Sequence, residues 1–136
     1  MVYRIYVEKK NGGLSDAKNT GLKYIEGEFI NFMDPDDIIS KNTLEEVYSF
    51  MKNNPEIDLA AIPLEFFEAR TGLHPKYEPM GKQNRVIDLD EEPYNYISSS
   101  ASTFYKKEVI SNKKFDVTMV GGEDTKFNCE LYKRNK

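Results

Sequence analysis

The order of apolar and polar positions predicts short strands that alternate with amphipathic helices. Residues 2–7 alternate in hydrophobicity and predict a strand. Helical spacing follows over residues 15–26, where Ser15 is the predicted N-cap and Gly27 the predicted end. Residues 28–33 form an apolar run, which predicts a central strand covered by helices on both faces. The apolar positions of the first helix are Leu14, Ala17, Gly21, Leu22 and Ile25.

The middle of the chain predicts a second helix and an interrupted strand. Thr43 and Glu46 have the spacing of a capping box, and the helix that they open is expected to end before Pro55. Its apolar stripe comprises Leu44, Val47, Tyr48 and Met51. Pro63 lacks an N–H donor, so residues 57–67 predict a bulged or edge strand, or two short strands. Residues 70–85 are rich in Gly and Pro and predict a loop. His74 in this loop is interpreted as a surface residue, with a functional role as the alternative.

The last third of the chain predicts several short elements. Strand pieces are expected at residues 86–89, 94–97 and 102–105, and a turn of helix at 106–112. Phe115 is expected in the core. A final helical pattern begins at Glu123 and Asp124, where the positive end of the helix dipole favours carboxylates. The pattern as a whole predicts one α/β domain over residues 1–136, in which helices cover the sheet.

Composition and charge narrow the class of protein. The chain has 136 residues and a net charge of −4, and its Lys and Arg residues are scattered, which argues against a nucleic-acid partner. The single cysteine, Cys129, excludes an internal disulfide. No apolar run approaches the roughly 18 residues of a membrane span, and no secretory signal is recognisable. These features predict a cytoplasmic protein.

Three acids, Asp34, Asp36 and Asp37, follow the predicted central strand directly, with Pro35 stiffening the turn. Like charges about 4 Å apart repel by roughly 4 kcal/mol at an effective dielectric near 20. The acids should therefore have raised pKa values or hold a hard divalent cation through oxygen ligands. Ligand sites in open α/β sheets lie beyond the carboxyl ends of strands, where this cluster is expected. A solvated acidic turn that caps the next helix is the alternative, and these residues alone leave both open.

Residues 11–19, with the sequence NGGLSDAKN, are followed by Gly21 and Leu22 and then by GEFINFMDPDD. This series resembles the signature of family 2 glycosyltransferases of the GT-A fold. Phe104, Tyr105 and Lys106 are similar to a later aromatic and basic segment of that family, and Glu123 with Asp124 to an acidic pair that opens a helix. The resemblance covers essentially the whole chain and implies a truncated GT-A, Rossmann-like mixed sheet.

The resemblance implies a metal-dependent, inverting transfer of a sugar from a nucleotide-diphosphate sugar donor. Asp36 would coordinate Mn²⁺ or Mg²⁺, Asp34 would share the ion or orient the ribose, and Asp37 would support the turn. Lys18 stands where family members usually have Arg, and it would contact the nucleotide or its phosphates. Asp16 is grouped with the donor-binding residues.

On the acceptor side, the resemblance makes Asp124 the candidate general base and Glu123 the second candidate. The acceptor would be a hydroxyl of a saccharide, a lipid-linked group or a polymer, such as a cell-envelope polysaccharide. The corresponding location is the cytoplasm, at the inner face of the membrane.

The chain also departs from the family pattern. Family members begin with two βα units that grip the base and ribose, whereas this chain begins near the third strand. It is therefore expected to be a portion of a longer enzyme and inactive by itself. One alternative is a shortened, non-catalytic interaction module that self-associates through an exposed sheet edge. Another is a phosphatase of haloacid-dehalogenase type with Asp34 as nucleophile, which is weakened by Ile38 where Thr or Val is expected.

Overall fold

The computed structural model describes residues 4–81, 83–93 and 99–132. The chain forms two compact units, one of residues 1–30 and 106–136 and the other of residues 31–105. The elements are α1 (Leu14–Leu22), β1 (Phe29–Asn31), α2 (Thr43–Asn53), β2 (Leu59–Ala61), β3 (Glu65–Phe66), β4 (Gly72–Leu73), η1 (Pro75–Met80), β5 (Thr103–Lys106), α3 (Lys107–Ile110) and α4 (Glu123–Tyr132). Helices and short strands thus alternate, which confirms the α/β class. The single domain over residues 1–136 stays a prediction.

Three strands of the described residues form the larger sheet, in the order β1-β5-β2. β2 runs antiparallel to β5, with Leu59 opposite Tyr105 and Ala61 opposite Thr103. β1 is an outer strand of the sheet that the structure describes, and its three residues are only half-buried. The prediction of a central strand at residues 28–33 is therefore wrong for the described part of the chain. An apolar run in the sequence does not show whether helices cover one face of a strand or both faces.

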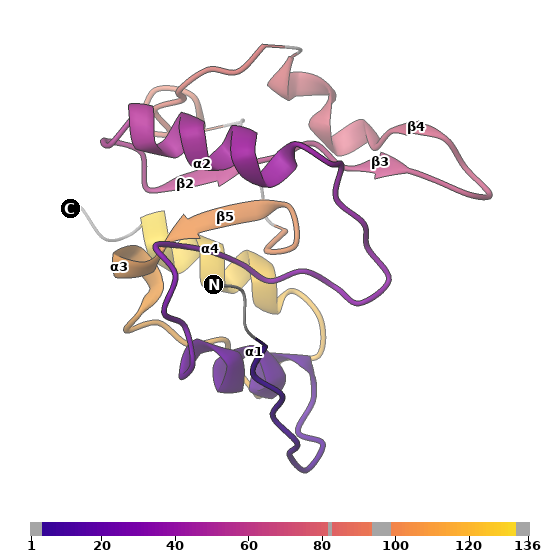
Figure 1. Cartoon of the computed structure of the whole chain (residues 1–136), viewed down its shortest axis with the longest axis vertical. Helices are drawn as coiled ribbons and strands as arrows, with labels where there is room; N and C mark the ends of the chain where they lie inside the picture. The colour runs from indigo at the N-terminus through magenta and orange to yellow at the C-terminus, as the bar shows by residue number, and fades with distance from the viewer. Residues whose placement is uncertain (1–3, 82, 94–98, 133–136) are drawn as a thin grey trace. The chain divides into compact units, whose positions relative to one another are not determined.

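In the unit of residues 31–105, α2 lies alongside β2 (Figure 1). The helix has the predicted end at Asn53, and Val47 and Met51 point into the core. Leu44 and Tyr48 are exposed, so only half of the predicted stripe is buried. Among the described residues of this unit, the buried apolar side chains are Val47, Met51, Tyr77, Phe104 and Tyr105.

The predicted capping box of α2 is wrong. Asn42 is the N-cap, and its side chain makes no capping hydrogen bond. Thr43 is already helical, and its Oγ1 instead pairs with Oγ of Ser40 at 2.6 Å. Glu46 donates its backbone N–H to the Asn42 carbonyl at 3.0 Å. The helix therefore begins one residue before the position that the Thr and Glu spacing indicated.

Short elements fill the segment that follows β2. The apolar run interrupted by Pro63 forms two short strands, β2 and β3, which was one of the predicted alternatives. β3 pairs with β4 in an antiparallel hairpin (Figure 1), and η1 follows. The side chain of His74 caps η1 by accepting a hydrogen bond from the Lys76 N–H. The prediction of a loop over residues 70–85 is thus wrong in part. These elements are held by strand pairing and capping, which hydrophobic periodicity does not reveal.

Residues 86–89 do not form the predicted strand. They lead into a turn in which Glu92 donates its backbone N–H to the Asp88 carbonyl at 2.8 Å. The predicted strand at residues 94–97 lies outside the described residues. The predicted strand at 102–105 is confirmed as β5, one residue further along.

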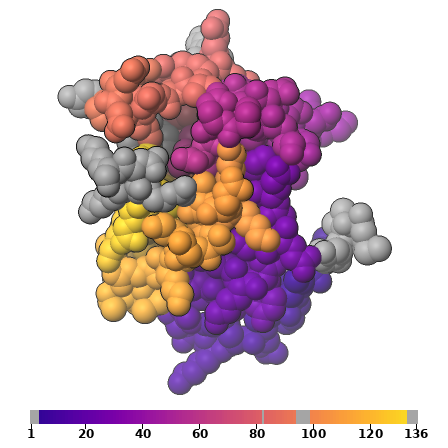
Figure 2. Space-filling view, turned by 90° about the vertical axis from the view of Figure 1, so that its left-hand side faces the viewer, coloured from indigo at the N-terminus to yellow at the C-terminus, as the bar shows by residue number. Residues whose placement is uncertain are grey.

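The unit of residues 1–30 and 106–136 joins an N-terminal and a C-terminal segment of the chain. Figure 2 shows the indigo N-terminal segment and the orange and yellow C-terminal segments against one another. Lys107 donates its backbone N–H to the Glu28 carbonyl at 2.9 Å. Val109, Ile110, Phe115, Phe127 and Leu131 are buried. This confirms the predicted helical turn after β5 and the core position of Phe115.

The first helix is shorter than predicted. α1 covers Leu14–Leu22, and Gly13 rather than Ser15 is its N-cap. Gly13 has a φ of 86°, which glycine adopts without steric cost, and its N–H donates to Oδ1 of Asn11 at 3.0 Å. At the other end, Lys23 and Tyr24 donate to carbonyls three residues back, so the last turn tightens and the helix ends before Gly27.

Residues 4–7 do not form the predicted strand, and Ile5, Tyr6 and Val7 are exposed. Alternation alone predicts a strand only where a neighbouring strand pairs with it, and within the described chain none does so here. No helix of the described residues is long and apolar enough to cross a membrane.

Candidate functional site

The buried face of α1 is polar. Ser15 is 5% exposed and Lys18 is 9% exposed, whereas Leu14 and Ala17 of the predicted apolar stripe are exposed. A buried ammonium group is costly unless it is paired, so the burial of Lys18 requires partners on the facing elements. The face of α1 toward the interior of its unit therefore carries the polar side chains of Ser15 and Lys18 instead of an apolar ridge.

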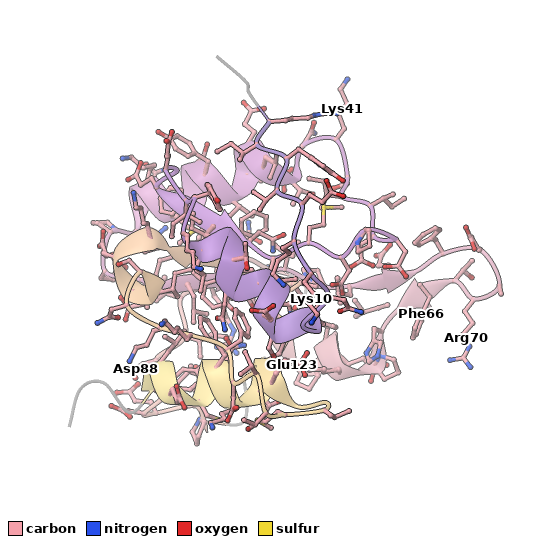
Figure 3. The ribbon with its side chains drawn as sticks, turned by 90° about the horizontal axis from the view of Figure 1, so that it is seen from below. Lys10, Lys41, Phe66, Arg70, Asp88 and Glu123 are labelled. Atoms are coloured by element: carbon pink, nitrogen blue, oxygen red, sulfur yellow. The ribbon has the colours of Figure 1, made fainter. Side chains whose placement is uncertain are left out.

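Lys18 contacts the acidic pair at the start of α4. Its Nζ lies 2.6 Å from Oδ1 of Asp124 and 4.0 Å from Oε1 of Glu123. The same Nζ lies 5.0 Å from the centroid of the Phe115 ring, within the range of a cation–π contact. Figure 3 shows Glu123 at the beginning of α4, on the side toward α1. The structure thus brings together three of the predicted site residues.

A structured turn leads into α4. Asp116 accepts hydrogen bonds from the backbone N–H of Thr118 at 2.8 Å and from its hydroxyl at 2.6 Å, and it forms an ion pair with Lys126. The hydrogen bond from Lys126, followed by those from Thr118, holds the pKa of Asp116 well below its usual value. Gly121 and Gly122 then both have positive φ, of 85° and 74°. This turn fixes where α4 begins and hence where its first-turn carboxylates lie.

Asn19, next to Lys18, is a structural residue that the sequence did not identify. Its Nδ2 donates to the Phe115 carbonyl at 2.8 Å, and its Oδ1 accepts from the Phe115 N–H at 2.7 Å. The Phe115 ring stacks on Phe127 with centroids 4.0 Å apart and planes 6° apart. The only sequence signal was the Asn that follows the basic residue in the NGGLSDAKN motif, which does not name a partner.

Asp16 contacts different residues from those that Lys18 contacts. It is half-buried and forms an ion pair with Lys9, on the segment before α1. Its backbone carbonyl accepts a hydrogen bond from the Thr20 hydroxyl at 2.8 Å. The donor-binding role of Asp16 stays a prediction.

The predicted acid cluster forms a turn of residues 34–37. The Asp37 N–H donates to the Asp34 carbonyl at 3.2 Å, which leaves Pro35 and Asp36 exposed at the corner. Burial raises the pKa of Asp37, and the charges of Asp34 and Asp36 raise it further. The electrostatic crowding expected from the sequence is therefore present at Asp37.

The turn fits one kind of metal site. Its donors are carboxylate oxygens, which hard divalent cations prefer. Among the described residues, no group of three or more His, Cys, Asp or Glu side chains is arranged to hold a metal ion. Mg²⁺ is commonly held by one or two carboxylates and completed by substrate phosphates and water. Asp34 and Asp36 suit an ion that arrives with a diphosphate, and their assignment as metal ligands stays a prediction.

Buried hydroxyl groups lie in the same unit as the acid turn. Tyr77 is buried, and its hydroxyl donates to Oγ of Ser102 at 2.7 Å. The hydroxyls of Ser102 and Thr103 both donate to the Ser99 carbonyl, at 3.3 and 2.7 Å. Burial raises the pKa of Tyr77, and the charge of Asp37 acts in the same direction. No pattern in the sequence indicated that the charge of Asp37 would act on Tyr77.

Comparison with known proteins gives a consistent result. The family model described as Glycosyl transferase family 2 matches residues 2–112. The chain is 43% identical over 123 residues to the minor teichoic acid biosynthesis protein GgaB of Bacillus subtilis strain 168, which covers 90% of this chain and 14% of GgaB. It is 29% identical over 130 residues to GgaA of the same strain, covering 93% of this chain and 29% of GgaA.

A third relative is the poly(ribitol-phosphate) beta-N-acetylglucosaminyltransferase TarP of Staphylococcus aureus strain N315. The identity is 27% over 132 residues, covering 96% of this chain and 39% of TarP. The chain therefore spans less than half the length of each of these three relatives.

Proposed function

This chain belongs to glycosyl transferase family 2, and from that membership we propose that the protein transfers a sugar from a nucleotide-diphosphate sugar to an acceptor hydroxyl. The family implies the GT-A, Rossmann-like fold that the sequence predicted. The observation that best supports the proposal is the contact of Lys18 with Asp124 at the start of α4. It holds a carboxylate at the position that the family resemblance gives to the general base. Family membership also removes the support for the phosphatase alternative.

In the proposed reaction, the acceptor oxygen attacks the anomeric carbon of the donor sugar. The bond between that carbon and the diphosphate oxygen breaks, and its electron pair leaves with the nucleoside diphosphate. The hydroxyl proton passes to the carboxylate of Asp124 as the new bond forms. A single displacement of this kind inverts the anomeric configuration. Glu123, which lies 4.0 Å from the same ammonium, is the second candidate for the base.

Asp36 and Asp34 would hold Mn²⁺ or Mg²⁺ together with the donor's diphosphate. When bound, such an ion supplies a Lewis acid that neutralises the negative charge of the leaving group. Burial is the main cause of the raised pKa of Asp37, and the charges of Asp34 and Asp36 raise it further. These neighbouring charges support the assignment, because a cation would offset them. Lys18 as a ligand of the donor phosphates also remains a proposal. Its contact with Asp124 favours a role on the acceptor side instead.

The names of the relatives suggest the class of acceptor. GgaB and GgaA are teichoic acid biosynthesis proteins, and TarP is named for transfer of N-acetylglucosamine to poly(ribitol phosphate). We therefore propose a cell-envelope polymer or its lipid-linked precursor as acceptor, and a cytoplasmic site at the inner face of the membrane.

The decisive experiment assays the whole protein with Mn²⁺, a panel of nucleotide sugars that begins with UDP-N-acetylglucosamine, and poly(ribitol phosphate) as acceptor. Acceptor-dependent release of nucleoside diphosphate is the expected result. If no donor in the panel supports transfer, the enzymatic proposal fails and a non-catalytic module replaces it.

Two variants then separate the proposed roles. Asp124→Asn should lower transfer by about 10²- to 10⁴-fold while donor binding, measured by calorimetry, stays within about twofold. Glu130→Gln is the matched acid-to-amide control on the same helix. Asp36→Ala should abolish the Mn²⁺ dependence of donor binding. Unimpaired transfer by Asp124→Asn would show that Asp124 is not the base. Mn²⁺-dependent donor binding by Asp36→Ala would show that Asp36 is not the metal ligand.

A further inference from the structure

The side chain of Asn19 forms hydrogen bonds to both the N–H and the carbonyl of the Phe115 backbone. Nδ2 donates to the carbonyl at 2.8 Å, and Oδ1 accepts from the N–H at 2.7 Å. A carboxamide offers a donor and an acceptor in one plane, which matches the two groups of a peptide backbone. Aspartate cannot donate and alanine can do neither. The identity of residue 19 therefore decides whether the backbone of Phe115 is held in this way.

The ring of Phe115 connects this backbone contact to the charged cluster. One contact is the stack on Phe127, at 4.0 Å between centroids, and another is the ammonium of Lys18, at 5.0 Å from the ring centroid. An ammonium over a ring face is attracted by the ring's quadrupole. Because a side chain moves with its own backbone, the bonds from Asn19 set where this ring face lies.

Lys18 carries a flexible side chain, and its ammonium takes a definite position only where its surroundings impose one. Here the ring of Phe115 and the Oδ1 atom of Asp124 both contact the ammonium, and the side chain is nearly buried. The hydrogen bond to Oδ1 limits how far the carboxylate can turn, and it therefore limits the direction of the second oxygen. General-base catalysis depends on that direction, because the base must lie within hydrogen-bond reach of the proton.

We propose that Asn19 is a positioning residue for Asp124 and acts on it through Phe115 and Lys18. This inference rests on the proposed function, in which Asp124 accepts the proton of the acceptor hydroxyl. Its consequence is that loss of the Asn19 amide slows the chemical step and leaves donor binding nearly unchanged. It also means that the effect of Asn19 requires the ammonium of Lys18 to be present.

The test is a double-mutant cycle in the whole protein. The substrates are the donor and acceptor that give transfer in the panel above, tried first as UDP-N-acetylglucosamine and poly(ribitol phosphate). Asn19→Ala should lower kcat about tenfold and change the donor KM by less than about twofold. In a Lys18→Met background, the same Asn19→Ala change should alter kcat by less than about twofold.

Thr20→Ala is the matched control, because Thr20 lies on the same helix and its hydroxyl bonds the Asp16 carbonyl instead of Phe115. It should leave kcat within about twofold of the unmodified protein. Lys18→Arg keeps a cation at the ring and should retain more activity than Lys18→Met. Phe115→Leu keeps the backbone that Asn19 bonds but removes the ring, and it should reproduce the loss of kcat even if Asn19→Ala does not fold.

An equal loss of kcat from Asn19→Ala in both backgrounds would overturn the proposal, since a merely structural role does not depend on Lys18. A loss confined to the donor KM would overturn it as well. If the unmodified protein transfers no sugar, the proposed function fails first and this inference fails with it. The two failures are therefore distinguishable.

Discussion

The ammonium of Lys18 lies 2.6 Å from Oδ1 of Asp124, although the two residues are 106 positions apart in the chain. The contact joins α1 to α4 within one unit of the protein. Lys18 is nearly buried, whereas the side chain of Asp124 is 23% exposed. Loss of the carboxylate would therefore leave a cation in a place that water reaches poorly.

Removal of one partner should cost more stability than removal of both. Asp124→Leu should lower the free energy of unfolding by about 2 kcal/mol, less than for a fully buried pair because Asp124 is partly solvated and Glu123 remains nearby. Adding Lys18→Met should restore most of this loss, because an apolar side chain of similar length needs no counterion. Urea unfolding of the two variants checks this. A double variant as unstable as the single one would contradict it.

The hydroxyl of Tyr77 should be worth about 1 kcal/mol to folding, because it donates to Ser102 in a buried environment. Tyr77→Phe removes only this hydroxyl and should lower the free energy of urea unfolding by that amount. Tyr24→Phe is the control, since Tyr24 is exposed, and it should change stability by less than about 0.5 kcal/mol. Equal effects of the two changes would show that the buried hydrogen bond adds nothing.

The acid turn should make stability depend on pH through Asp37, whose pKa is raised above its usual 3.8 by burial and by Asp34 and Asp36. A raised carboxylate pKa means that the folded state binds the proton more tightly. The contribution of this group is thus present below the unfolded pKa and lost as the pH rises through the folded pKa.

Asp37→Asn should therefore gain stability relative to the unmodified protein between about pH 3.5 and pH 7, as measured by urea unfolding at both values. Asp58→Asn is the control, because Asp58 is an exposed acid outside the turn. A difference between Asp37→Asn and the unmodified protein that does not change with pH would refute the assignment. Mn²⁺ should reduce the gain if it binds at this turn.

Asp116 should show the opposite trend, because Lys126 and Thr118 hold its pKa well below the usual 3.8. A depressed carboxylate pKa contributes stability that is present above the unfolded pKa and is lost as the pH falls toward the folded value. Asp116→Asn should destabilise the protein at neutral pH, and the difference should shrink as the pH falls below about 4. Lys126→Met should show the same trend in urea unfolding. A loss that is constant with pH would contradict the ion pair.

The elements that the sequence predicted well are those whose stability is local. α2 has a periodic apolar pattern and good helix formers, and it ends at Asn53 as predicted. The acids of α4 lie in its first turn, where the helix dipole favours them. The interruption at Pro63 follows from a missing N–H donor, which is a property of one residue.

The predictions that failed depended on partners far away in the chain. The periodic pattern of α1 indicated Leu14 and Ala17 as the inner face. Lys18 is buried instead, because the Phe115 ring and the Asp124 carboxylate contact its ammonium. β4 has only two residues, and its pairing with β3 defines it. Residues 2–7 carry a strand pattern, but the described residues 4–7 have no strand beside them.

The same difference between local features and distant contacts applies to the candidate site. The chemical types of Asp34, Asp36, Glu123 and Asp124 could be recognised from their motifs. The mutual contacts could not, since neither the Asn19 bonds to Phe115 nor the ion pair of Lys18 leaves a periodic signal in the sequence.

The two glycines before α4 limit how this loop can be engineered. Both residues have positive φ, and a Cβ added at Gly121 would meet no atom within 4 Å. The restriction at Gly121 is thus one of backbone conformation and not of space, so most side chains would be strained there although there is room for them. Variation in this loop should use exposed neighbours such as Val117 and Val120 and should keep Gly122. Asn, which tolerates left-handed conformations, is the one replacement worth including at residue 121.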